Sequence, residues 1–276
     1  MKRFNCLSFL GIVIILLLCL TAVLASLISP YSPTEQNLDE GLTGPSKEHI
    51  LGQDKLGRDI LSRIIYGSRV SLKVGIFTVG ISLIIGLMIG SIAGFFGGIV
   101  DDIIMRIIDI FMAFPGILMA IALMAVLGPS LNNVIIALCL LGWVGYARLV
   151  RGQMLSVREF EFVLAAKAMG ANPFRIIMKH LLPNIFSPVI VQATFGMAGA
   201  IVAEAGLSFL GLGTQPPIPS WGSMLNEGME FILVAPYLTI YPGLAIMIVV
   251  LGFNFLGDGI RDILDPRYYQ RIHLKK

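Results

Sequence analysis

Charged residues are scarce in this sequence: Asp, Glu, Lys and Arg make up 13% of its 276 residues, while 56% are hydrophobic. Soluble domains carry about 25% charged and about 45–50% apolar residues. The shortage of charge excludes a soluble surface for a chain of this length. The length is better divided into membrane spans of about 20 apolar residues each. The formal net charge of +3 is small and predicts no nucleic-acid partner.

Residues that form disulfides and metal sites are also few. The three cysteines, Cys6, Cys19 and Cys139, lie in or beside apolar runs and form no Cys-x-x-Cys pair. We expect them to be inert small hydrophobic residues. The three histidines are far apart in the sequence, so we expect no metal site and no cofactor.

Catalytic motifs are missing as well. The segment 52–59 has the spacing of a phosphate-binding loop, but Arg58 and Asp59 stand where that loop needs Lys and Ser or Thr. Residues 206–210 resemble half of a nucleophile elbow, without its final glycine or a clear His-Asp pair. There is no His-Glu-x-x-His motif. We therefore expect no catalytic residue and no enzyme activity, and any energy for transport must come from another chain.

What the sequence does contain is apolar runs long enough to cross a membrane. Six spans are expected, at about 7–29, 74–100, 103–127, 134–150, 185–206 and 236–257. The first run is longer than the 7–15 apolar residues typical of a signal peptide, so we interpret it as a retained span. A signal peptide cleaved near Ala25 is the alternative.

The distribution of Lys and Arg predicts the orientation of these spans. With the N-terminus inside, the cytoplasmic stretches 1–6, 97–106, 148–184 and 258–276 hold 14 of the 20 basic residues. The other six lie in residues 30–73, which also carry six acidic residues. The chain then divides into 1–29, the N-terminal tail and first span; 30–73, an extracytoplasmic segment; 74–257, a five-span core; and 258–276, a cytoplasmic tail.

Two features inside the spans have alternative interpretations. Gly86, Gly90 and Gly94, extended backward by Ser82, form a stripe of small residues that favours close helix packing, either within this chain or on a second subunit. Glu204 is an acid well inside an apolar run. It is either a pathway or gate residue, or a hydrogen-bonded structural acid near the outer interface.

Shorter patterns predict local structure. Residues 59–66 place apolar side chains on one face, which indicates a short amphipathic helix. It is expected to lie along the membrane or on a partner, or to pack on the protein's own surface. Asp102, Arg106 and Asp109 are spaced to pair along one helix face. Pro115 is expected to kink the third span. Residues 207–235 are rich in Gly, Pro and Ser, and their prolines are expected to block regular helix.

The cytoplasmic loop 158–184 has the most specific pattern. Residues 159–169 are good helix formers, and Gly170 suits the end of that helix. Asn172 is a natural N-cap, and Pro173 fits the first position of a second short helix. That helix is expected to end before Pro183. Two short helices meeting at a slim corner suit docking into a groove on a soluble partner.

This loop resembles the EAA coupling loop of ABC importer permeases, which contacts the ATPase subunits. The family pattern is Glu-Ala-Ala, three residues, Gly, nine residues, Ile, one residue, Leu-Pro. The matching residues are Ala165, Ala166, Gly170, Leu182 and Pro183. Leu164 stands where the family has Glu, and His180 where it has Ile. Glu161, one helical turn before Leu164, is the expected substitute for the missing acid.

Other segments resemble the C-type permeases of dipeptide, oligopeptide and nickel importers. They are 51–59, 204–213, 215–217, 219–222 and 257–266. The resemblance implies an all-α integral membrane protein with six transmembrane helices and the type I ABC importer fold, in the bacterial cytoplasmic membrane. The partners it implies are a homologous B-type permease, two ATP-binding subunits and an extracytoplasmic substrate-binding protein.

The expected cargo is a dipeptide or oligopeptide, with nickel or a metal chelate as the alternative. The scarcity of His and acidic residues in the spans favours peptide. A secondary transporter or channel would show inverted repeats or broken helices near the membrane centre, and no clear repeat is present. A membrane-embedded enzyme would need a catalytic constellation, which the sequence lacks.

Overall fold

The computed structural model describes residues 6–264, and these residues form helices and loops without a named strand. The α-helices are α1 (Cys6–Ile28), α2 (Ile60–Phe96), α3 (Gly98–Met112), α4 (Gly116–Leu127), α5 (Leu131–Val157), α6 (Glu161–Ala168), α7 (Pro173–Ile176), α8 (Leu182–Phe209), α9 (Trp221–Met229) and α10 (Tyr237–Leu264). A π-helical turn, Ile177–Leu181, joins α7 to α8. The predicted all-α class is confirmed.

The expected six spans correspond to five unbroken helices and one bent pair. α1, α2, α5, α10 and the helix from Pro173 to Phe209 are long and apolar enough to cross a membrane. α3 and α4 replace the single third span predicted at 103–127, and they meet at an angle of 82°. The expectation of a mere kink was wrong, because Pro115 lacks an N–H and disfavours helix in the residue before it.

α2 is 37 residues long, about 55 Å at 1.5 Å per residue. The hydrocarbon core is about 30 Å thick, so several turns of α2 project beyond it. The helix predicted at 59–66 is the start of α2 and not a separate element. Ile60 is buried there together with Ser62 and Arg63, while Ile64 and Ile65 are half-buried. Of the interpretations of this segment, packing on the protein itself is confirmed.

The stripe of small residues on α2 packs against α5 of the same chain. A Cβ at Gly86 would collide with Tyr146, and one at Gly94 would lie 2.5 Å from the Met154 Cβ. Side chains on these glycines would push the two helices apart. Of the two interpretations of the stripe, packing within the chain is confirmed.

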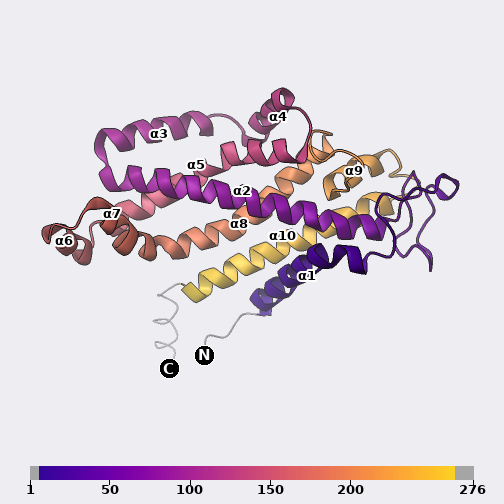
Figure 1. The fold of residues 1–276 in the computed structure, drawn as a ribbon, viewed down its shortest axis with the longest axis horizontal. Coiled ribbons are helices and arrows are strands. Elements are labelled where there is room, and N and C mark those ends of the chain that lie inside the picture. Colours follow the sequence, from indigo (N-terminus) through magenta and orange to yellow (C-terminus); the bar gives the residue numbers. More distant parts are fainter. Residues whose placement is uncertain (1–5, 265–276) are drawn as a thin grey trace.

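The helices form an elongated bundle whose two ends differ (Figure 1). α2 runs beside α5, and α1 packs on α10, which packs on α8. α6 and α7 protrude at one end, whereas the loop that follows α1 lies with α9 at the other. This separation agrees with the expectation that residues 158–184 and 30–73 face opposite sides of the membrane.

Two helices extend beyond the sequence predictions. α9 lies inside residues 207–235, where no regular helix was expected. The helix can form because the prolines of this segment come before its first residue. Ser220 and Ser223 form a capping box at its start. α10 continues to Leu264, so the expected tail begins within a helix. The rest of that tail, residues 265–276, and the N-terminal residues 1–5 lie outside the described residues.

Candidate functional site

The loop predicted to be cytoplasmic folds into a compact projection, residues 161–183, which we term the knuckle. α6 ends in a Schellman motif: the Gly170 N–H donates to the Lys167 carbonyl at 3.0 Å, and the Ala171 N–H donates to the Ala166 carbonyl at 3.1 Å. This ending needs a residue with positive φ, and Gly170 has a φ of 77°. The predicted role of Gly170 as a helix stop is confirmed.

The second half of the knuckle begins as predicted and ends differently. The Asn172 side chain accepts a hydrogen bond from the Arg175 N–H at 2.7 Å, and Pro173 follows in the first turn. The helix was expected to end before Pro183, but it continues past this residue. The π turn at 177–181 carries it into α8 instead. A π turn shifts the hydrogen-bond register, which accommodates a proline that has no N–H to donate.

An apolar core holds the knuckle against the bundle. Val163 on α6 and Leu181 in the π turn are fully buried, and Ile176 on α7 is nearly so. They pack in one cluster with Met154 of α5 and Ile185 of α8. The knuckle is therefore a rigid extension of two membrane-spanning helices and not a loose loop.

The outer surface of the knuckle is also apolar. The exposed large side chains are Phe162, Leu164, Met169, Phe174 and Met178, and Phe160 directly before the knuckle is exposed as well. Met169 is 81% exposed and Phe174 73% exposed. Apolar side chains clustered on one projection are typical of a protein interaction surface.

The residues predicted to contact an ATPase all belong to the knuckle or the first turn of α8. They are Glu161, Ala165, Ala166, Gly170, Leu182 and Pro183. All except Ala166 are at least partly exposed. Leu164, which replaces the family's Glu, is exposed and apolar. His180 lies in the π turn, with its ring centroid 6.4 Å from that of Phe162.

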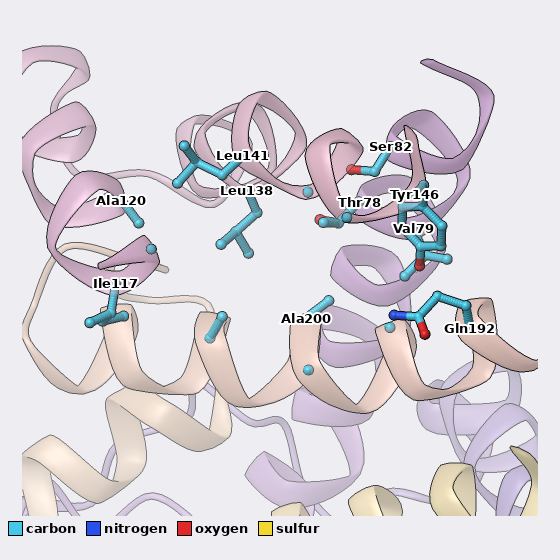
Figure 2. Close-up of a pocket in the computed structure, with 16 residues that line it drawn as sticks. Thr78, Val79, Ser82, Ile117, Ala120, Leu138, Leu141, Tyr146, Gln192 and Ala200 are labelled. Carbon is cyan, nitrogen blue, oxygen red and sulfur yellow. The ribbon is translucent and has the colours of Figure 1, made fainter. Parts of the chain in front are cut away.

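A groove with a volume of about 340 Å³ lies between four helices (Figure 2). α8 forms one wall, and residues of α2, α4 and α5 form the other. The lining residues are Thr78, Val79, Ser82, Gly116, Ile117, Ala120, Leu138, Leu141, Gly142, Gly145, Tyr146, Gln192, Gly196, Gly199, Ala200 and Ala203. The lining is mainly small and apolar and contains no charged side chain.

Sequence reasoning did not find this groove. Its lining comes from runs of residues far apart in the sequence, and each run by itself resembles ordinary span packing. The amide of Gln192 near the middle of a span was the one available signal. A polar side chain there is expected to face a cavity and not lipid.

Glu204 lies on α8 outside the groove lining. It is fully buried, and the Ser208 hydroxyl donates a hydrogen bond to its Oε1 at 2.6 Å. The Ser208 oxygen also accepts from the Thr214 N–H at 3.1 Å, which ties the end of α8 to the following loop. These contacts fit the interpretation of Glu204 as a structural acid, while its role as a gate stays a prediction.

The opposite end of the bundle is held by a cluster of charges, which we term the outer cap: buried Asp54, Arg58 and Arg63, and half-buried Glu227. Arg58 Nε donates to Asp54 Oδ2 at 2.6 Å, and Arg63 donates to the same oxygen. Glu227 of α9 accepts from Arg58 Nη2 at 2.6 Å and from Arg63 Nη1 at 2.8 Å. The loop that resembles a phosphate-binding loop therefore encloses its own carboxylate, which would repel phosphate.

Another ion pair lies at the knuckle end of the spans. Arg151 Nη2 donates to Asp101 Oδ2 at 2.6 Å and joins α5 to α3. The pairing predicted along Asp102, Arg106 and Asp109 was wrong, since no ion pair joins these three side chains in the part of the chain that the structure describes. The buried acid of α3 is the preceding residue, Asp101, which pairs with Arg151.

A multi-helix membrane bundle with an uncharged groove through the spans and a rigid projection at one end defines the membrane component of a transporter. Residues 86–270 match the model for the inner membrane component of binding-protein-dependent transport systems. Residues 3–45 match the model for the N-terminal transmembrane domain of oligopeptide transport permease C. The chain belongs to this family of binding-protein-dependent transport permeases, as its sequence motifs indicated.

Individual relatives match this chain over nearly its whole length. The chain is 50% identical to a dipeptide transport system permease of Alkalihalophilus pseudofirmus, over 95% of this chain and 86% of the relative. It is 45% identical to a glutathione transport system permease of Pectobacterium atrosepticum, over 92% and 84%. An inward-facing structure of the MetNI methionine ABC transporter matches with a TM-score of 0.62 and 19% identity, over 75% and 98%. This structural likeness shows the fold.

Proposed function

We propose that this chain is one of two permease subunits in an ATP-driven importer of short peptides. The observation that carries the proposal is 50% identity, over 95% of the chain, to a dipeptide transport permease. The groove fits that role, since a zwitterionic or neutral peptide needs a wide path without a strong charge of either sign. Its lining has no charged residue and several glycines.

The partners follow from the two ends of the bundle. The apolar surface of the knuckle suits an ATP-binding subunit, one for each of the two permeases. Exposed apolar residues on the bent pair, such as Ile103, Ile110 and Leu118, suit lipid or the homologous second permease. The outer cap and the loops around it suit the extracytoplasmic substrate-binding protein.

The knuckle supports a mechanical role in transport. ATP binding would bring the two ATP-binding subunits together and move the knuckles that rest on them. Because the knuckle shares its core with α5 and α8, a displacement of the knuckle would move both helices. Both line the groove, so the motion would switch its access from outside to inside. In this arrangement both termini lie in the cytoplasm, and residues 74–257 form the permease core.

Peptide uptake tests the cargo directly. A strain lacking this chain should lose uptake of a radiolabelled dipeptide and recover it when the chain is restored with its neighbouring subunits. An excess of unlabelled dipeptide should compete, whereas nickel should not. Competition by nickel alone, with no loss of peptide uptake in the deletion strain, would overturn the peptide assignment in favour of metal.

Glutathione is a second candidate cargo. Glutathione permeases of two enterobacteria are 44–45% identical to this chain. Glutathione is itself a tripeptide, so the same groove chemistry would serve. Unlabelled glutathione that competes better than dipeptides would assign the tripeptide as the main cargo, and weaker competition would favour dipeptides.

The knuckle surface can be tested separately from its fold. Phe174→Ala removes an exposed aromatic side chain from the tip, and Phe186→Ala removes one that is 61% exposed on α8. We expect only Phe174→Ala to weaken co-purification of the ATP-binding subunit and to lower transport. Equal effects of the two substitutions, or no effect of either, would contradict the docking of the ATP-binding subunit at the knuckle.

A further inference from the structure

The groove contains an exposed amide in the middle of a membrane span. Gln192 is the eleventh residue of α8, about 15 Å from the helix start at 1.5 Å per residue. Its side chain lines the groove with the amide nitrogen turned into it, near Tyr146 (Figure 2). A neutral amide can donate and accept hydrogen bonds at once, so it is matched to another amide.

Three hydroxyl groups lie along the opposite wall. Thr78, Ser82 and Tyr146 are at most 6% exposed, and their hydroxyl oxygens are buried. The hydroxyls of Ser82 and Tyr146 lie against Gly142 and Gly196, where an added Cβ would come within 2.5 Å of them. Among the four polar side chains of the lining, Gln192 is therefore the one that is open to an occupant of the groove.

Glycines determine the width of the groove. A Cβ at Gly142 would meet the Ser82 hydroxyl, and one at Gly196 would meet the Tyr146 hydroxyl, so packing explains these two. Gly116, Gly145 and Gly199 differ, because a Cβ there would meet no atom within 4 Å. None of these three has a positive φ. Neither packing nor backbone conformation within the chain requires glycine at these three positions.

The Gln192 amide and the three glycines line the same groove. We propose that the groove holds the passing peptide by its main-chain amides, with Gln192 as a direct contact, and that Gly116, Gly145 and Gly199 set the largest side chain that can pass. This inference rests on the proposed function and adds a binding site to it. Main-chain recognition would let one path accept many peptide sequences.

Other occupants fit the groove less well. A lipid chain would leave the exposed Gln192 amide unpaired, at a cost in free energy. A free metal ion would need carboxylate, imidazole or thiolate ligands, and the lining has none. A peptide bond carries one donor and one acceptor, which is the complement of an amide.

The width of the groove can be tested in the assembled transporter. Gly145→Leu and Gly199→Leu fill the groove, while Gly152→Leu on α5 and Gly206→Leu on α8 are matched controls outside its lining that also have open space for a Cβ. Uptake of labelled diglycine and diphenylalanine would be compared for each variant, together with co-purification of the second permease. We expect diphenylalanine uptake by the groove variants to fall by about tenfold or more, because the leucine side chain would clash with the large peptide. Most diglycine uptake should be retained.

Three results would overturn the proposal. One is equal uptake of both peptides by the groove variants and their controls. Another is equal loss of both peptides in the groove variants alone. A third is loss of the second permease from the complex, which would assign the space to that partner. If the wild-type transporter imports neither peptide, the proposed function fails, and that result is distinct from the three others.

The amide contact needs its own variant. Gln192→Leu keeps the size of the side chain and removes its hydrogen bonds, whereas Gln192→Asn keeps an amide. We expect Gln192→Leu to lower kcat/KM of uptake by about two- to tenfold, the effect of one net hydrogen bond, and by the same factor for peptides with different side chains. Gln192→Asn should recover part of the loss. A loss that depends on the side chains, or no loss, would contradict main-chain recognition.

Discussion

The two ends of the bundle are stabilised by opposite kinds of interaction. The knuckle is held by an apolar core and by backbone hydrogen bonds at its helix ends, and it presents apolar side chains to the outside. The outer cap is held by ion pairs among three buried residues, Asp54, Arg58 and Arg63, and the half-buried Glu227. The end that projects its apolar residues is suited to grip a partner, while the end that buries its charges is suited to keep a fixed shape.

The difference also concerns sequence distance. The knuckle is built almost entirely from one continuous stretch, so its geometry is local. The outer cap joins residues 54–63 to Glu227 across more than 160 positions. Its ion pairs therefore fix the start of α2 against α9, which local preferences could not do. Substitutions at the two ends should therefore differ in how much stability they cost and in how far along the chain their effects spread.

The largest effect is expected at the outer cap. Asp54→Asn removes a carboxylate that pairs with two buried arginines and leaves their charge undercompensated. We expect a loss of about 3–5 kcal/mol in stability, the usual cost of breaking a buried pair. Thermal unfolding of the purified complex in lipid nanodiscs would measure it. A loss below about 1 kcal/mol would show that the cap behaves like an exposed pair.

An intermediate effect is expected in the knuckle core. Ile176→Ala empties a nearly fully buried position on α7. We expect about 2–3 kcal/mol of local destabilisation, the lower part of the range for such truncations, because a projection has fewer neighbours to lose. Faster amide hydrogen exchange in α6 and α7, with the outer cap unchanged, would show it. Exchange that rises equally at both ends would contradict an independent knuckle core.

A smaller effect is expected where the two knuckle helices meet. Gly170→Ala forces a Cβ into a backbone with a φ of 77°, although the space around it is open. We expect a cost of about 1 kcal/mol, from the left-handed conformation alone. Gly152→Ala, inside α5 near its C-terminal end, is the matched control and should be neutral or slightly stabilising. Equal results for the two would show that the turn does not need glycine.

The smallest effect is expected from an exposed ion pair beside the outer cap. Lys55 Nζ lies 3.4 Å from Glu230 Oε2, and the two side chains are 40% and 67% exposed. Lys55→Met should change stability by less than about 1 kcal/mol, and salt should reduce even that. Thermal unfolding at low and high salt would measure it. A loss comparable to that of Asp54→Asn would remove the distinction between buried and exposed charges at this end.

Much of the fold followed from the sequence. Apolar runs of membrane length predicted the five unbroken spans and the position of the bent pair, and Gly170, Asn172 and Pro173 predicted the local geometry of the knuckle. The predictions that went wrong concern continuity. Pro115 separates α3 from α4 by 82°, whereas Pro183 is carried through a π turn without ending its helix. A proline disfavours helix locally, and only the surrounding packing decides whether the helix continues.

The candidate sites divide in the same way. The residues of the EAA-like loop are contiguous and carry a family pattern, so they could be named before the structure. The groove could not, because Thr78, Tyr146 and Gln192 share no sequence motif and meet only when α2, α5 and α8 pack together. The burial of Arg58 and Arg63 was missed for the same reason, since their carboxylate partner Glu227 lies in a helix that was not expected.

The sequence by itself determined that this chain has apolar runs long enough to cross a membrane, and it predicted that one loop docks on a partner that supplies the energy. Each of these depends on composition or on local hydrogen bonding along a short stretch. The tertiary structure decided which face of each helix is buried, where the spans bend and which distant residues share the groove. Those outcomes depend on contacts between helices, whose free energy is distributed over residues that the sequence does not place together.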